Sequence, residues 1–217
     1  MSTERTHPYL FWGLLCAIAV SGLIIAVCLY PSVARYYFVK TNSHKIFGVV
    51  ATGSVEDVKY FIERGVSVNE KPPRDMSLLH IAVRLNPDVN VMKYLIGNGA
   101  DVNAKDDDGA TPLHIVARYS LSNIEKAKTL IDNGADVNAK DNHGRIPLHF
   151  MASFSLIDLE VMKYLIEKGA DVNAKDNDGA TPLDYVIRHP IISSGAIDER
   201  KAILCEAGGK RGEELPE

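Results

Sequence analysis

The stretch that decides the fold is Gly99-Ala-Asp-Val-Asn-Ala-Lys-Asp106, because the chain repeats it. The same eight residues stand at 134–141 and again at 169–176, and a weaker copy, Gly65-Val-Ser-Val-Asn69, precedes all three. The four copies begin 34, 35 and 35 residues apart. A constant period of this length is typical of arrays in which one small structural unit is stacked on the next.

A second signature keeps the same spacing and begins a helix in each unit. In Thr111-Pro-Leu-His114 the threonine is a favoured N-cap, and proline at the first helical position loses no hydrogen bond. The corresponding segments are Ser77-Leu-Leu-His80, Ile146-Pro-Leu-His149 and Thr181-Pro-Leu-Asp184. Apolar side chains then recur at helical spacing up to the glycine of the first signature, where a left-handed residue ends a second helix. Each unit is therefore predicted to be a helix, a turn and a second helix.

The two signatures resemble the ankyrin repeat, whose units are about 33 residues long and share a Thr-Pro-Leu-His core. The resemblance covers residues 43–210 and implies an all-α fold, an ankyrin-repeat solenoid of helix-turn-helix units with β-finger loops. It places the tips of the fingers at three Asp-x-x-Gly stretches, 106–109, 141–144 and 176–179. In this family the partners are proteins, which bind along the concave side through the finger tips and the ends of the first helices.

The period divides the repeat region into five units, of which the two terminal ones are atypical because one of their faces meets water. The units are a cap at 43–74, full repeats at 75–108, 109–143 and 144–178, and a second cap at 179–210. Residues 211–217 are expected to be a frayed acidic tail. Ile146 replaces a capping threonine, which is expected to cost about 1 kcal/mol. Asp184 replaces the histidine of the other units, so the role of that histidine is not carried over to the last unit.

The N-terminal part of the chain has a different pattern. Leu10 to Tyr30 is a run of 21 residues without a charge. At about 1.5 Å per residue, a helix of this length spans the roughly 30 Å hydrocarbon core of a bilayer. Aromatic residues flank the run, and Pro31 ends the helix. We predict an N-terminal flank at 1–9, a transmembrane helix at 10–30 and a basic juxtamembrane linker at 31–42.

The charges on either side of this run predict its orientation. Arg35 and Lys40 follow it, whereas Glu4 offsets Arg5 before it. Positive charge stays on the cytoplasmic side, so we expect a single-pass membrane protein with cytoplasmic repeats. The alternative is a signal peptide cleaved near Ala34, which would release a secreted interaction protein or effector. Against cleavage, the apolar run is longer than the usual h-region of roughly 7–15 residues.

Candidate chemistry is limited to one histidine per repeat, at positions 80, 114 and 149. Stacking separates neighbouring copies by roughly 10 Å, which is too far for convergent metal–nitrogen bonds of about 2 Å. The resemblance implies instead that each histidine ties the start of its helix to neighbouring backbone. The sequence has no phosphate-binding glycine motif, no nucleophile motif and no Cys-x-x-Cys pair. We expect no catalysis, no metal, no cofactor and no small-molecule substrate.

The charge balance bears on the class of partner. The chain has 24 Lys and Arg against 28 Asp and Glu, a formal net charge of −4. A protein that binds a nucleic acid duplex needs a basic face, so no nucleic-acid partner is expected. Carried over by position, the family's partner-binding residues correspond here to Arg84, Leu85, Asp107, Asp108, Ala110, Arg118, Tyr119, Asn142, His143, Arg145, Phe154, Asn177, Asp178 and Ala180.

These observations combine into one expected function. A single spanning helix precedes near-identical repeats, and the chain shows no catalytic motif. We expect a membrane-tethered scaffold or adaptor that binds a protein partner through the concave ankyrin surface.

Overall fold

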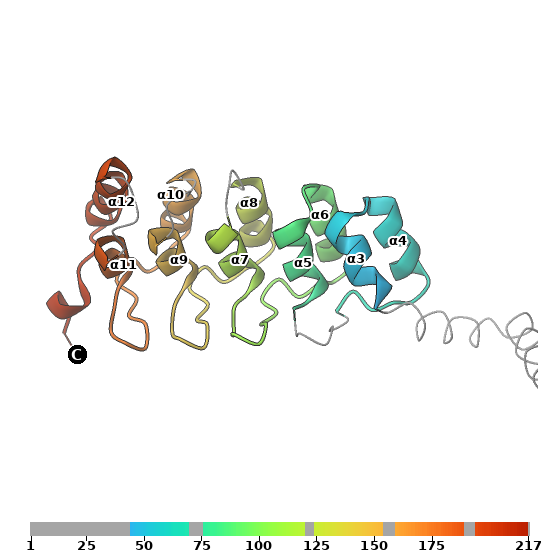
Figure 1. Ribbon diagram of the computed structural model, residues 1–217, viewed down its shortest axis with the longest axis horizontal. Coiled ribbons are helices and arrows are strands. Elements are labelled where there is room, and N and C mark those ends of the chain that lie inside the picture. The colour runs from blue at the N-terminus through green and yellow to red at the C-terminus, as the bar shows by residue number, and fades with distance from the viewer. Residues whose placement is uncertain (1–43, 70–75, 120–123, 154–158, 189–193, 217) are drawn as a thin grey trace, which may run out of the picture.

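The computed structural model of the 217-residue chain describes residues 44–69, 76–119, 124–153, 159–188 and 194–216 (Figure 1). The predicted transmembrane helix, the juxtamembrane linker and Phe154 lie outside these ranges. Among the helices inside them, none is long and apolar enough to cross a membrane.

Within the described ranges the chain forms ten α-helices in five consecutive pairs, and no residue is assigned to a strand. The predicted all-α class is therefore confirmed, and the fingers are loops. The pairs are α3 (Lys45–Thr52) and α4 (Val55–Glu63), α5 (Leu78–Leu85) and α6 (Val89–Gly97), α7 (Pro112–Tyr119) and α8 (Ile124–Asp132), α9 (Pro147–Ser153) and α10 (Leu159–Glu167), and α11 (Pro182–Arg188) and α12 (Ser194–Glu206), followed by the 3-10 turn η1 (Gly212–Glu214).

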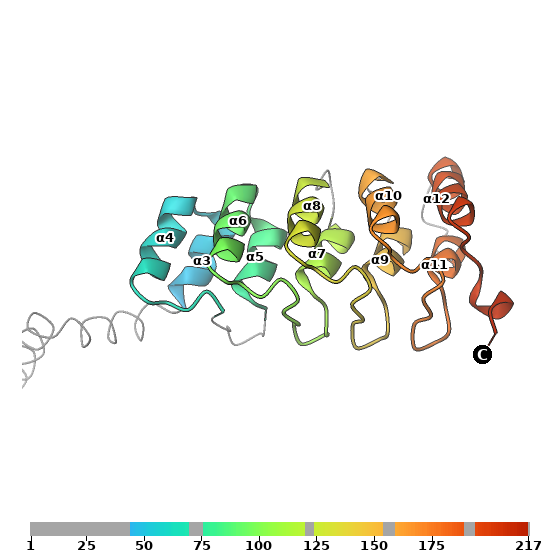
Figure 2. The same ribbon diagram turned by 180° about the vertical axis from the view of Figure 1, so that it is seen from behind.

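The pairs stack in a line (Figures 1 and 2). The first helices pack on one another in the order α3, α5, α7, α9 and α11, and the second helices in the order α4, α6, α8 and α10. Each first helix from α5 onward contributes a leucine to one continuous core, namely Leu79, Leu113, Leu148 and Leu183. A single pair could not bury its apolar side alone, so the stack is what stabilises the fold. Truncating one of these leucines to alanine is expected to cost about 2–5 kcal/mol.

The local signals that the sequence predicted are present at the helix ends. Ser77 caps α5, where its hydroxyl accepts a hydrogen bond from the backbone N–H of His80. Gly99, Gly134 and Gly169 have φ angles of 87°, 89° and 90°, which glycine adopts without strain. Ile146 is fully buried, and its N–H bonds to Nδ1 of His149 at 3.1 Å. The backbone N–H at this position thus keeps a hydrogen-bond acceptor although the threonine hydroxyl is absent.

An asparagine in each copy of the first signature fixes one unit to the next. Nδ2 of Asn103 donates to the carbonyl of Gly134 at 2.9 Å, and its Oδ1 accepts from the N–H of Asp136 at 2.9 Å. The same pair of bonds is made by Asn69, Asn138 and Asn173. These bonds set the stacking register, and the sequence alone did not indicate them.

Two buried polar side chains cap first helices from a later unit. Nδ2 of Asn86 donates to the carbonyls of Val50 and Gly53 at the end of α3, at 2.8 and 3.0 Å. Nζ of Lys126 donates to the carbonyls of Val83 and Asn86 at the end of α5, both at 2.8 Å. Burial lowers the pKa of the Lys126 ammonium, since the low-dielectric interior disfavours its charged form.

The expectation of a frayed C-terminal tail was wrong for residues 211–216. The N–H of Gly212 donates to Oδ2 of Asp184 at 2.7 Å, and Nε of Arg211 lies 3.1 Å from Oδ1 of the same carboxylate. Nζ of Lys175 donates to the carbonyls of Leu215 and Pro216. The tail is held because Asp184, unlike a histidine, is an anion that accepts hydrogen bonds from both its own helix start and the returning chain.

Candidate interaction surface

Each finger is a tight loop closed by one aspartate. In the first finger, Oδ1 of Asp106 accepts hydrogen bonds from the N–H of Asp108 at 3.0 Å and of Ala110 at 2.8 Å. The N–H of Asp106 in turn donates to the carbonyl of Ala110 at 3.0 Å. Asp141 and Asp176 hold the next two fingers in the same way. This is the local pairing that makes aspartate a turn residue, and it gives each finger one defined shape.

Neighbouring fingers are also bonded to each other. The N–H of Asn142 donates to the carbonyl of Asp108 at 2.9 Å, and its Nδ2 donates to the carbonyl of Asp107 at 2.9 Å. Asn177 makes the equivalent bonds to the carbonyls of His143 and Asn142, at 2.9 and 3.0 Å. The finger tips therefore form one linked row along the lower edge of the stack in Figure 1.

Most of the predicted tip residues are accessible on this row. The exposed ones are Asp107, Asp108, Asn142, His143, Asn177 and Asp178. Ala110 is half-buried. Ala180 is only 2% exposed, so its methyl group offers nothing to a partner in this conformation.

Arg145 is a predicted contact residue whose charge is already used inside the stack. Its Nη2 lies 2.7 Å from Oδ2 of Asp141, and its guanidinium carbon lies 4.5 Å from the ring centroid of Phe150. The side chain is half-buried between these two groups. Arg145 thus braces its own finger.

The repeated histidines have the structural role that the resemblance implied. Nδ1 of His114 accepts from the N–H of Thr111 at 3.0 Å, and its Nε2–H donates to the carbonyl of Arg145 in the next unit at 3.0 Å. His80 and His149 make the same cross-unit bond at 2.9 and 3.2 Å. Burial is the largest cause that lowers the pKa of all three imidazoles. They are held as the neutral Nε2–H tautomer, because Nδ1 must remain an acceptor.

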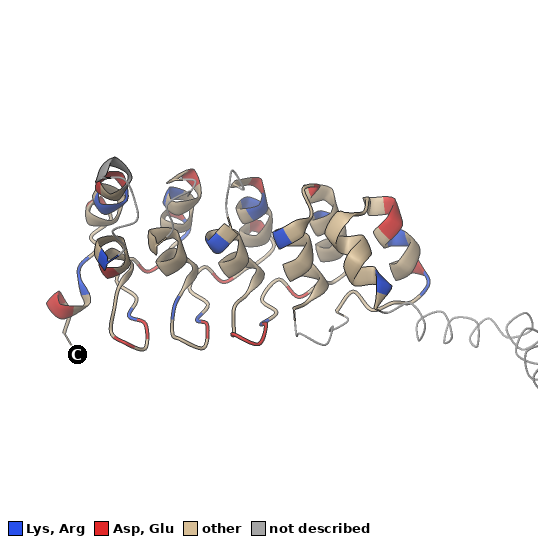
Figure 3. Cartoon of the chain, viewed as in Figure 1, with Lys and Arg blue, Asp and Glu red and all other residues tan. Residues whose placement is uncertain are grey.

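The ends of the first helices carry exposed apolar side chains beside arginines. Leu85 is 56% exposed and Tyr119 is 44% exposed. Ile187, near the end of α11, is 45% exposed, although the corresponding residues of α5 and α7, Val83 and Ala117, are buried. We call the following six residues the arginine ridge: Arg84, Leu85, Arg118, Tyr119, Ile187 and Arg188. Figure 3 shows basic residues at these ends of α5, α7 and α11.

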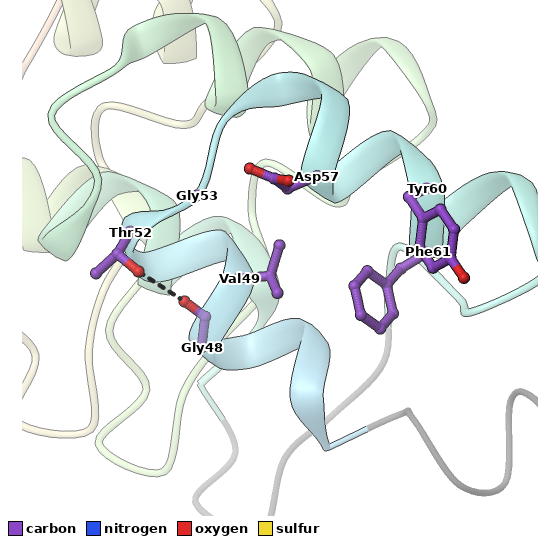
Figure 4. Close-up of a pocket in the computed structure, with 7 residues that line it drawn as sticks. All are labelled: Gly48, Val49, Thr52, Gly53, Asp57, Tyr60 and Phe61. Carbon is purple, nitrogen blue, oxygen red and sulfur yellow. Dashed lines mark hydrogen bonds between the residues drawn. The ribbon is translucent and has the colours of Figure 1, made fainter.

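The N-terminal end of the stack has a separate hollow of about 300 Å³ between α3 and α4 (Figure 4). The side chains of Val49 and Phe61 point toward one another across it, and Tyr60 lies at its rim, 47% exposed. Hydrogen bonds from Ser54 lower the pKa of Asp57, which also lines the hollow. The hollow is thus lined by residues of the first helix pair and of the short turn between its helices.

The chemistry available on these surfaces is recognition by shape, charge and hydrogen bonding. In the ranges that the structure describes, no group of His, Cys, Asp and Glu side chains could hold a metal ion. Among the titratable groups with shifted pKa values, His114 serves a helix start, Asp141 a finger and Asp184 the C-terminal tail.

Comparison with known proteins agrees with this architecture. The family model described as "Ankyrin repeats (3 copies)" matches residues 46–141 and 123–198. No protein in the comparison with curated proteins matches the chain. The matched residues cover well over half of the sequence and include the three fingers and the three repeated histidines, so the chain belongs to the ankyrin-repeat family.

Proposed function

We propose that this protein is a membrane-tethered scaffold that binds a protein partner through its linked fingers and its arginine ridge. Ankyrin repeats are typically non-catalytic modules that mediate protein–protein contacts, which supports the binding part of the proposal. The strongest support for partner binding is a pattern of exposed apolar side chains. Leu85 and Tyr119 are exposed at corresponding positions at the ends of α5 and α7, and each directly follows an arginine. Exposed apolar groups that recur on one side of a stack are expected of a surface that a partner covers.

The fingers support the same side of the molecule. Their backbones are bonded to each other through Asn142 and Asn177, so the row changes shape little when a partner binds. A preorganised surface loses less conformational entropy on binding than a set of independent loops does.

A cross-linking experiment in cells tests the binding side. A photoreactive amino acid is placed in the full-length chain at Leu85, or at Lys163 as a matched exposed position on the second-helix side. We expect a discrete adduct from position 85 and none from position 163. Equal cross-linking from both positions, or none from either, would contradict the proposal.

The tether rests on the sequence of Leu10 to Tyr30, which has no charged residue across 21 positions. Deleting this run should move the protein from the carbonate-resistant membrane fraction to the supernatant. A deletion variant that stays in the membrane fraction would exclude this tether. N-terminal sequencing that began near Ala34 would show cleavage and exclude it as well.

A further inference from the structure

We infer that the arginine ridge takes an acidic segment of the partner that carries an apolar side chain between its carboxylates. This inference rests on the proposed function and specifies the chemistry of the partner. Its basis is a cluster at the contact between two units, where Arg84 of α5 and Arg118 and Tyr119 of α7 meet.

The guanidinium groups of Arg84 and Arg118 both lie over the ring of Tyr119. The guanidinium carbon of Arg84 lies 4.9 Å from the ring centroid, and that of Arg118 lies 5.5 Å from it. Both distances fall within the roughly 6 Å range of cation–π attraction. The ring therefore positions two arginines from successive units in advance, and each can offer two parallel N–H groups to a carboxylate.

No ion pair among the described residues neutralises these cations. The ion pairs formed among the described residues use Lys59, Lys93, Arg145 and Arg211, and none involves Arg84, Arg118 or Arg188. Arg145 shows the contrast, because Asp141 pairs with it at 2.7 Å. A carboxylate from outside would therefore meet two positioned guanidinium groups that belong to no ion pair in the part of the chain that the structure describes.

A second tyrosine provides an internal comparison. Nζ of Lys128 and of Lys168 lie 5.5 and 5.2 Å from the ring centroid of Tyr164. There the hydroxyl of Tyr164 donates to Oδ1 of Asp132 at 3.4 Å, so an acid of the chain is already present. The two clusters look alike, but the one on the ridge is without an internal acid among the residues described.

The exposed apolar residues next to the arginines predict that the segment also carries an apolar side chain. Leu85 lies directly beside Arg84 at the end of α5, and Ile187 lies beside Arg188 at the end of α11, three units further along the stack. A segment made only of acidic residues would leave these side chains in water. One with a leucine, isoleucine or phenylalanine between its carboxylates covers them, and burial of apolar area adds to the affinity.

The acidic finger tips disfavour binding of the acidic segment at the fingers. Asp107, Asp108 and Asp178 are exposed at the tips, so an acidic segment is repelled there and attracted at the helix ends. Repulsion of this kind contributes to specificity by setting the register of the partner.

The test uses random 12-residue peptides displayed on phage and selected on the full-length chain in detergent. We expect enriched peptides to carry two or more Asp or Glu around a large apolar residue. A synthetic peptide of the enriched sequence should bind at least tenfold more weakly to the double variant Arg84→Gln, Arg118→Gln. Its affinity should also fall as salt is raised, because exposed charge pairs are screened.

The matched control is the double variant Lys128→Gln, Lys168→Gln, which removes two cations around Tyr164 and should leave the affinity unchanged. Thermal melting of both variants checks that they fold. Enrichment of basic or uncharged peptides, or an affinity insensitive to the arginine substitutions, would overturn the inference. Failure to enrich any peptide would overturn it too.

These outcomes separate the inference from the proposed function. A cross-link from position 85 together with peptides that are not acidic leaves protein binding in place and removes only the partner chemistry. The absence of both the cross-link and any selected peptide removes both.

Discussion

At the scale of single residues, the stack depends on polar groups buried between units. His80, His114 and His149 each join a helix start to the next unit and are at most 1% exposed. Each ring accepts a hydrogen bond at Nδ1, so protonation there would remove the acceptor. Their roles follow from position in the unit, and none of them lies on the arginine ridge.

The histidines make stability depend on pH. Burial lowers their folded-state pKa below the ordinary 6.5, so the unfolded chain takes up protons first as the pH falls through this value. Stability is therefore complete above about pH 6.5 and is lost progressively below it. We expect the urea midpoint to be lower at pH 5.5 than at pH 7.5. The variant His114→Gln should show a smaller change, and an equal change in this variant would contradict the assignment.

Lys126 is the residue whose removal should reveal inter-unit capping. Lys126→Met leaves the carbonyls of Val83 and Asn86 without their donor. An unsatisfied buried acceptor costs about 1–3 kcal/mol, partly offset because the variant no longer buries a charge. We expect a net loss of about 1–2 kcal/mol in the free energy of unfolding.

Lys128→Met is the control for this experiment, since Lys128 is exposed two residues further along the same helix. It should change stability by no more than about 0.5 kcal/mol. Equal losses in the two variants would show that the carbonyl bonds of Lys126 contribute nothing.

At the scale of elements, the sequence predicted most helix starts and ends, because those signals are local. Thr111 and Pro112 begin α7, and Gly99 follows α6 with a left-handed backbone. The bonds made by Asn103 and Lys126 were not predicted, since their partners lie 31 to 43 residues away in other units. A pattern in one unit does not show which side chain faces the next.

The dependence on contacts between units also explains where the predicted surface residues lie in the structure. The exposed finger tips followed from turn chemistry, but burial of Ala180 and the use of Arg145 depend on contacts with neighbouring groups. Arg188 could have been included by aligning α11 with α7, which places it at the position of Arg118, whereas Ile187 aligns with the buried Ala117 and could not have been found in this way. The C-terminal tail is held by hydrogen bonds from Arg211 and Gly212 to Asp184. These residues are 27 and 28 positions apart from Asp184 in the sequence, so a local pattern did not predict the contact.

Two glycines should respond in opposite ways to alanine. A Cβ at Gly48, within α3, would meet nothing within 4 Å, so Gly48→Ala should stabilise the protein by about 0.5–1 kcal/mol through helix propensity. A Cβ at Gly109, where φ is +73°, would overlap Oδ1 of Asn142. Gly109→Ala should destabilise by more than about 1 kcal/mol. Urea unfolding measures both, and the same sign for the two would refute this account of the fingers.

At the scale of the whole molecule, short bonds between neighbouring units join five helix pairs into one body. The asparagine and histidine bonds and the finger contacts all run along the stack axis. Because each unit contacts only its neighbours, the stability of the array is approximately a sum of unit and interface contributions. The fingers project along one edge of this body, and the second helices form the opposite edge (Figures 1 and 2).

The most direct test of the account is hydrogen exchange on the full-length chain, with and without the partner captured by cross-linking at position 85. We predict slower exchange on binding at the finger tips around 107–110 and 142–145 and at the helix ends 84–85 and 118–119. Exchange in α6, α8 and α10 should be unchanged. Protection confined to those second helices, with none at the fingers and the arginine ridge, would contradict the account.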